Sequence, residues 1–177
     1  MIERYKYTES ELASLLKSIT VVVDTREKSN SHITEYFEKH HIPFITKALH
    51  EFDYTFFLPE NPELGIMKDL YFDRDIVFER KGSLEELATN FTKHRARFEE
   101  EMCNCKALNK YLVIENANYS DVVTGNYQSE YNSKSYVGTL HSFNTRYDLQ
   151  LVFMPDPSYT ALYMYATMQY YLRNILK

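Results

Sequence analysis

Tryptophan is absent from the chain, and cysteine is nearly so, with two residues in 177. Cys103 and Cys105 lie two apart in a predicted helix, so their side chains point to different sides of it. That spacing suits neither a disulfide nor a pair of metal ligands. We therefore expect a protein of a reducing compartment.

Long apolar runs are also missing, and no charged, apolar and small-residue leader precedes the first predicted element. We therefore expect neither a membrane span nor a signal peptide. No internal repeat or low-complexity linker is visible. The sequence predicts one cytoplasmic domain over residues 1–177, with an N-terminal helix in residues 1–18 and a core in residues 19–177.

The chain has no excess of positive charge, since 20 lysines and arginines face 25 aspartates and glutamates and give a formal net charge of −5. General nucleic-acid binders are usually basic, so this balance argues against non-specific adhesion to DNA. Any contact with DNA must come from a local patch. The six histidines show no metal-ligand spacing, and no serine or cysteine arrangement suggests covalent catalysis.

The most informative stretch is residues 76–81, where Ile, Val and Phe run directly into Glu79, Arg80 and Lys81 before Gly82. This pattern predicts a buried strand that ends in charged residues. Because side chains alternate along a strand, Glu79 and Lys81 should share one face and Arg80 should point to the other.

Other predicted strands cover residues 21–23, 44–49, 54–58, 111–115 and 149–154. Between them, caps and apolar periodicity predict helices, including one with Ser83 and Glu86 as a capping box and an apolar stripe to Met102, and one that Ser158 begins. Strands and helices alternate, so we expect an α/β fold with a central mixed sheet flanked by helices.

Acidic residues concentrate where these strands end: Asp24, Asp53 and Glu79, with Glu27 as a weaker candidate. Carboxylates that converge on one point repel each other unless a divalent cation neutralises them. Oxygen ligands suit Mg²⁺ or Mn²⁺. A neighbouring lysine such as Lys81 could orient or deprotonate a water and offset phosphate charge, so metal-assisted phosphodiester hydrolysis fits this set best.

The chain resembles the XPF-type structure-specific nuclease domain, a branch of the PD-(D/E)xK nucleases with a restriction-endonuclease-like three-layer fold. Short stand-alone versions carried by bacteriophages and prophages are the most similar. The resemblance rests on residues 22–27, 52–54, 79–81, 95–98, 112–115 and 149–155, in that order and at strand ends.

The resemblance implies that Asp53 and Glu79 are the principal metal ligands and that Lys81 is the catalytic lysine. Asp24 would be a further acid at the metal or in its water shell. The residues implied to support the site or contact DNA are Arg26, Glu27, Arg80, Glu85 and Arg97. The implied reaction is metal-dependent cleavage of branched or junction DNA in recombination and repair, within a bacterial host cell.

Two positions depart from the family pattern. Phe52 stands where the family has glycine before the aspartate, which changes the backbone freedom next to Asp53. Glu85 stands where the family has aspartate, four residues after the lysine, and keeps the charge on a longer arm. The tandem helix-hairpin-helix domain of larger members has no counterpart in this sequence, so a protein partner could supply DNA binding.

Other hypotheses stay open. The same residues suit a Holliday-junction resolvase or a recombination exonuclease, and a catalytically weak DNA-binding or scaffolding module is a further alternative. Glu79 and Lys81 could also form a simple ion pair at a strand end. Glu86 is expected to be only a helix cap, because acids are favoured in the first turn of a helix.

Tyrosine is unusually common, with 16 residues, and five of them crowd the last predicted helix on several faces. One apolar stripe does not require so many. Amphipathic rings beyond the needs of a core suggest a partner surface. Together with the resemblance, this predicts a homodimer. The alternative is that the last helix simply packs between the sheet and a neighbouring helix.

Overall fold

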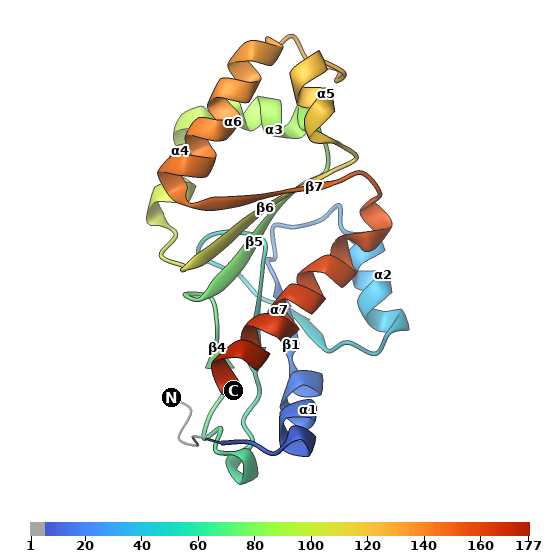
Figure 1. Cartoon of the computed structure of the whole chain (residues 1–177), viewed down its shortest axis with the longest axis vertical. Coiled ribbons are helices and arrows are strands. Elements are labelled where there is room, and N and C mark those ends of the chain that lie inside the picture. The colour runs from blue at the N-terminus through green and yellow to red at the C-terminus, as the bar shows by residue number, and fades with distance from the viewer. Residues whose placement is uncertain (1–5) are drawn as a thin grey trace.

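The computed structural model describes residues 6–177 and shows a mixed β-sheet between two layers of helices (Figure 1). The predicted α/β class, with a central mixed sheet flanked by helices, is thereby confirmed. The predicted N-terminal helix covers Glu9–Ser18, and residues 1–5 of that prediction lie outside the described residues. No helix in the described range 6–177 is long and apolar enough to cross a membrane.

The sheet has seven strands: β1 (Thr20–Val23), β2 (Phe44–Thr46), β3 (Tyr54–Leu58), β4 (Leu70–Tyr71), β5 (Ile76–Lys81), β6 (Asn109–Glu115) and β7 (Leu149–Met154). The main path runs β2-β1-β3-β5-β6-β7, and β4 pairs with β3 outside this path. Strands β1 and β2 are parallel, as are β5, β6 and β7, whereas β3 is antiparallel to both β1 and β5. Strand β3 therefore joins two parallel units.

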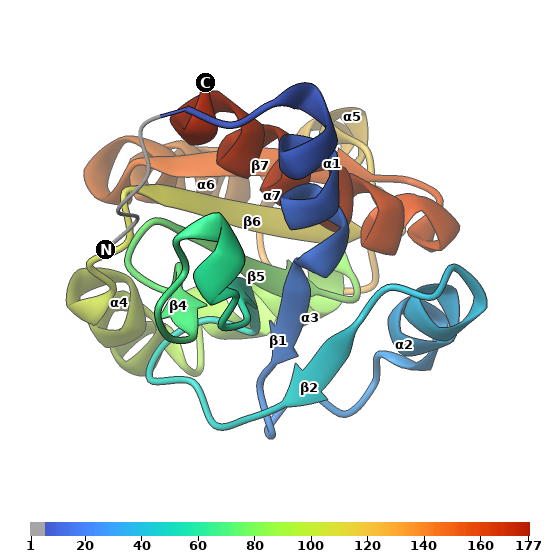
Figure 2. The ribbon, with the colours of Figure 1, turned by 90° about the horizontal axis from the view of Figure 1, so that it is seen from below.

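Helices lie on both faces of the sheet (Figures 1 and 2), and each face has its own apolar core. One core is covered by α1 (Glu9–Ser18), α2 (Ser31–Lys39) and α7 (Thr160–Leu176). The other is covered by α3 (Leu84–Phe91), α4 (Arg95–Asn104), α5 (Tyr119–Thr124) and α6 (Ser133–Tyr147). Two short 3₁₀ turns, Pro62–Leu64 and Pro157–Tyr159, complete the regular structure.

Helix starts follow the sequence in part. Helix α1 begins with a capping box of Thr8 and Glu11. The prediction that Ser158 begins the last helix is wrong, because Asp156 accepts a hydrogen bond from the Ser158 amide and a 3₁₀ turn precedes α7. The predicted box of Ser83 and Glu86 is half correct. Ser83 Oγ accepts from the Glu86 amide at 3.3 Å, but the Glu86 carboxylate accepts from the Gly82 amide at 2.8 Å.

The long helix predicted to run to Met102 is instead two helices, α3 and α4, separated by residues 92–94. Thr92 leaves the helical conformation, and its hydroxyl donates to the Ala88 carbonyl at 2.7 Å. The break brings the rings of Phe91 and Phe98 onto Phe143 of α6, with centroid separations of 4.8 and 5.5 Å. The packing of Phe91 and Phe98 on Phe143 therefore outweighs the apolar periodicity that predicted one continuous helix.

Phe52 precedes β3 with a φ of +67°, a left-handed conformation that costs a side-chain-bearing residue about 1–2 kcal/mol. Its ring is buried, 3% exposed, in the core beneath α3 to α6. The backbone turn suits the glycine of the family pattern, and ring burial offsets the strain of having phenylalanine there.

Replacing Phe52 with glycine should lower the free energy of unfolding by about 2–4 kcal/mol, because losing a buried ring costs more than the relieved strain returns. Urea denaturation measures this loss. The matched control is His41→Gly at an exposed residue with φ of +53°, which should not destabilise the fold. A Phe52→Gly protein as stable as wild type would contradict this account.

Candidate active site

Strand β5 delivers its charged residues to opposite faces of the sheet, as its pleat requires. On one face Lys81 Nζ lies 2.6 Å from Glu79 Oε1. On the other face the Arg80 guanidinium pairs with Glu27 and Glu115. All three side chains of Glu79, Arg80 and Lys81 are buried. The predicted division of the strand between two faces is confirmed.

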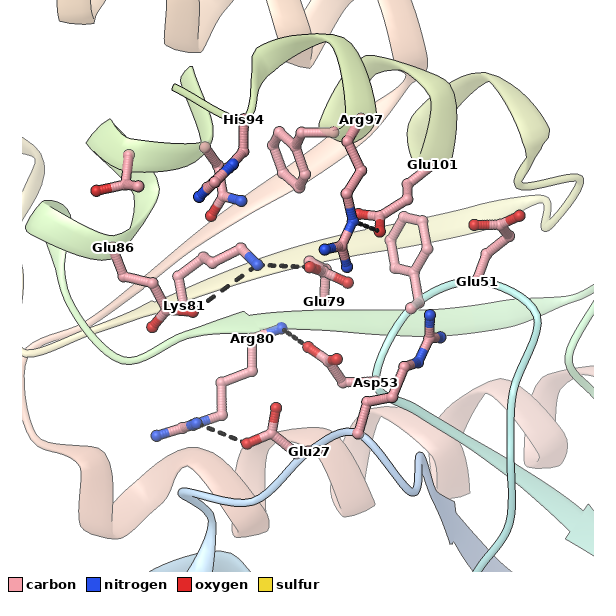
Figure 3. A pocket seen from close by; sticks show the side chains of 15 residues that line it. Glu27, Glu51, Asp53, Glu79, Arg80, Lys81, Glu86, His94, Arg97 and Glu101 are labelled. Carbon is pink, nitrogen blue, oxygen red and sulfur yellow. Dashed lines mark hydrogen bonds and ion pairs between the residues drawn. The ribbon is translucent and has the colours of Figure 1, made fainter. Parts of the chain in front are cut away.

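A cavity of about 380 Å³ opens over Glu79 and Lys81 (Figure 3). Its carboxylates outnumber its cations by two. The acids are Glu27, Glu51, Asp53, Glu79, Glu86 and Glu101, and the cations are Arg26, Arg80, Lys81 and Arg97. The structure therefore brings together seven of the predicted site residues, namely Arg26, Glu27, Asp53, Glu79, Arg80, Lys81 and Arg97.

Asp53 is fixed through its main chain and its side chain. Its amide donates to the Phe78 carbonyl at 2.9 Å, and its carbonyl accepts from the Asp24 amide at 2.8 Å. Its Oδ2 then accepts from the Arg80 amide, also at 2.8 Å. The carboxylate thus takes the place that a backbone carbonyl would hold in the ladder between β3 and β5, and this aims Asp53 at the cavity beside Glu79.

The pKa values of Asp53 and Lys81 are both raised in the cavity, but for different reasons. Burial raises the pKa of Asp53 well above its ordinary value, and repulsion from Glu79 raises it further. Burial alone would lower the pKa of Lys81, but attraction to Glu79 and Asp53 more than offsets it and holds that pKa above its ordinary value. Lys81 is therefore a firmly protonated ammonium.

The same cavity fits a divalent cation held in the manner of Mg²⁺. Among residues 6–177, no group of three or more histidine, cysteine, aspartate or glutamate side chains is arranged as a metal cage. Mg²⁺, however, commonly uses one or two carboxylates and keeps several waters. Asp53 and Glu79 supply that donor set. The pKa of Asp53 is raised by burial and also by repulsion from Glu79, which a cation would relieve.

Asp24 is not brought into the cavity. Its Oδ2 lies 2.7 Å from Arg26 Nε, and its carboxylate is 1% exposed beneath that guanidinium. Burial would raise the pKa of Asp24, but the Arg26 hydrogen bonds and charge hold it below its ordinary value. In this arrangement Asp24 orients Arg26, and the predicted role of Asp24 at the metal or its water shell stays a prediction.

Glu85 and Glu86 exchange the places expected of them. Glu85 Oε1 accepts from the Gln128 amide at 2.6 Å and lies outside the cavity. Glu86, expected to be only a helix cap, lines the cavity, with Oε1 3.9 Å from Lys81 Nζ. The start of α3 turns Glu86, not Glu85, toward the cavity, so Glu86 is the acid of this helix that lies near Lys81.

Sequence reasoning also missed cavity residues on α3 and α4. Thr89, Asn90 and His94 line the wall opposite β5, together with Arg97, whose Nε lies 3.1 Å from Glu101 Oε1 (Figure 3). The break between the two helices turns His94 and Arg97 toward the cavity. A helical wheel drawn through residues 84–102 could not show this, because it assumes one continuous helix.

Comparisons with known proteins bear on the family and the fold of the chain. A family model described as the ERCC4 domain matches residues 23–167. The fold is similar to that of XPF from Aeropyrum pernix, with a TM-score of 0.59 at 17% identity over 89% of this chain and 62% of that chain. XPF from Aeropyrum pernix in complex with DNA gives a TM-score of 0.60 at 19% identity over 88% and 66% of the two chains.

The chain thus spans less than two thirds of the length of either XPF structure. A comparison with curated protein sequences gives no significant match. The predicted resemblance and the predicted fold are both confirmed by the family model and the shared fold.

Asp53→Asn should raise the melting temperature of the metal-free protein at pH 7 by about 2–4 °C, or roughly 1 kcal/mol in a domain of this size. The pKa of Asp53 is raised by folding, so the stability it contributes is present in acid and lost as pH rises through that pKa. The gain from asparagine should therefore shrink toward pH 4. Thermal unfolding at both pH values measures it.

Asp24→Asn is the matched control with the opposite sign. The pKa of Asp24 is lowered by folding, so its contribution is present above the ordinary aspartate pKa and lost in acid. Asparagine there should lower the melting temperature at pH 7. A loss of stability in Asp53→Asn at pH 7 would contradict the proposed carboxylate repulsion.

Proposed function

The chain belongs to the ERCC4 domain family, and on that premise we propose that it is a divalent-metal-dependent DNA endonuclease that cuts branched or junction DNA during recombination or repair. The observation that carries this proposal is the convergence of Asp53, Glu79 and Lys81 in one charged cavity. One of the two similar structures is an XPF protein in complex with DNA, which supports DNA as the substrate class.

In this proposal Asp53 and Glu79 hold Mg²⁺ or Mn²⁺ at the wall formed by β5. A bound divalent cation would supply Lewis-acid charge to the scissile phosphate and lower the pKa of a bound water. The need for a cation follows from the cavity's own charge, because its carboxylates outnumber its cations and would repel a phosphodiester.

Lys81 acts in its protonated form. Its Nζ is held 2.6 Å from Glu79 Oε1, and the raised pKa keeps the proton on the nitrogen. A protonated amine cannot accept a proton from water, so Lys81 orients the attacking water and offsets charge on the phosphate. Glu86 holds the opposite side of this ammonium. Arg26 and Arg97 are the proposed contacts to DNA phosphates at the cavity mouth.

The direct test is to incubate wild type, Asp53→Asn and Glu79→Gln with labelled flap, fork, four-way and linear DNA, with Mg²⁺ or with EDTA. Wild type should cut branched DNA only with Mg²⁺, and each variant should lose about 100-fold or more in kcat. If wild type cuts nothing, or the variants cut equally well, the endonuclease proposal is lost. Preferential cutting of four-way junctions or of DNA ends would indicate a resolvase or an exonuclease instead.

Glu85→Gln and Glu86→Gln form a matched pair for the placement of the second acid. Both change one carboxylate in the first turn of α3, but only Glu86 lines the cavity. We expect Glu86→Gln to lower kcat by about 10-fold and Glu85→Gln to leave it within about twofold. Equal effects of the two variants would refute the assignment of Glu86.

The tyrosine-rich last helix supports a second proposal, that two copies of the chain associate through α7. A groove of about 780 Å³ lies between α7 and strands β6 and β7, where β7 ends the sheet. Tyr159, Leu162 and Tyr170 on its rim are 57, 44 and 65% exposed. Exposed aromatic and aliphatic side chains around one groove are typical of a partner surface.

Sedimentation equilibrium at micromolar concentration tests this association. Wild type should sediment as a dimer, and Leu162→Glu with Tyr170→Glu should sediment as a monomer of unchanged secondary structure. Val123→Glu is a matched control, since Val123 is 51% exposed on α5, away from the groove. A monomeric wild type would refute the homodimer and favour a different protein partner that supplies DNA binding.

A further inference from the structure

Glu115, the last residue of β6, is a buried carboxylate that lies outside the cavity. It is 1% exposed. Its Oε2 accepts from Arg80 Nε at 2.9 Å and lies 2.7 Å from Arg80 Nη2. Its Oε1 accepts from the Thr160 hydroxyl at 2.6 Å and lies 2.8 Å from His32 Nε2. A carboxylate with this many donors has little freedom to rotate.

These partners come from three elements, one strand of the sheet and two helices that cover it. Arg80 lies on β5, Thr160 opens α7, and His32 lies in the first turn of α2. Burial would raise the pKa of Glu115, but hydrogen bonds from Arg80, Thr160 and His32 hold that pKa below its ordinary value. The group is therefore an anion that holds two nitrogens of the Arg80 guanidinium, Nε and Nη2, on its Oε2.

Arg80 connects this contact to the cavity on the other side of the sheet. Its side chain is fixed by Glu115 and by Glu27, whose Oε1 lies 2.9 Å from Arg80 Nη1. Its main-chain amide donates to Asp53 Oδ2 at 2.8 Å. A displacement of Arg80 would therefore move the donor that orients the Asp53 carboxylate.

We propose that Glu115 is a positioning residue for DNA cleavage, because its hold on Nε and Nη2 of Arg80 fixes the main-chain donor that aims Asp53 at the cavity. This inference rests on the proposed function for its kinetic readout. Glu115 touches neither the cavity nor anything bound there. Its effect reaches the reaction only through Arg80.

The experiment compares Glu115→Gln with Thr160→Val. Glutamine keeps the shape of Glu115 but removes the charge that holds the guanidinium. Thr160→Val removes a different donor from the same carboxylate and leaves both Arg80 contacts in place. Both variants should lose stability, so their kcat and Mn²⁺ affinity are compared at a similar loss of melting temperature.

Two functional readouts separate positioning from stability. Glu115→Gln should lower kcat for branched DNA by about 10-fold with KM within about twofold, and should weaken Mn²⁺ binding in titration calorimetry by about 10-fold. Thr160→Val should keep both quantities within about twofold at a similar loss of melting temperature. Glu115→Asp keeps the charge on a shorter arm and should give an intermediate loss, so it serves if the glutamine variant does not fold.

The positioning role is overturned if Glu115→Gln retains wild-type kcat and Mn²⁺ affinity, or if Thr160→Val loses as much of both. The calorimetric arm does not require cleavage. If wild type cuts no DNA, the endonuclease proposal fails, and Mn²⁺ affinity still decides whether Glu115 positions Asp53.

Discussion

The ion pairs of the buried Arg80 guanidinium are the interactions on which the rest of the structure depends. Burying an isolated charge costs several kcal/mol, and Arg80 avoids this because Glu27 and Glu115 hold it on two sides. Removing Arg80 would leave the carboxylates of Glu27 and Glu115 without their shared cation in the protein interior. The same two contacts tie β5 to the loop after β1 and to the end of β6, so the strand that carries Glu79 and Lys81 is fixed from behind.

That arrangement places the charges that stabilise the fold on one face of the sheet and the charges proposed to act in catalysis on the other. On the α7 side the charges are saturated, with Glu115 bound to Arg80, Thr160 and His32. On the α3 side they are out of balance, since carboxylates outnumber cations around the cavity. Saturated charges stabilise a single conformation, whereas unbalanced ones create an electrostatic need that a bound cation can meet.

Much of this could be predicted from the sequence, because the strongest signals are local. Charges that flank apolar runs place Asp53 and Glu79 at strand ends, and the period of two puts Glu79 and Lys81 on one face. What could not be predicted depends on contacts between distant segments. The break at Thr92 follows from two rings that pack on Phe143, and the inward turn of Glu86 follows from how α3 leaves β5. Nothing near Asp24 in the sequence reveals that Arg26 covers it.

The strict alternation along β5 has a consequence for how the chain can change over time. Inserting or deleting one residue between Ile76 and Lys81 would exchange the two faces. It would take the Arg80 guanidinium away from Glu27 and Glu115 and turn Lys81 toward those two carboxylates. Residues 59–69, which hold a 3₁₀ turn and one isolated bridge between Asn61 and Ile66, carry no such alternation of faces. Length variation among relatives of this chain should therefore accumulate in that loop, while the six residues of β5 keep their spacing even where their apolar members differ.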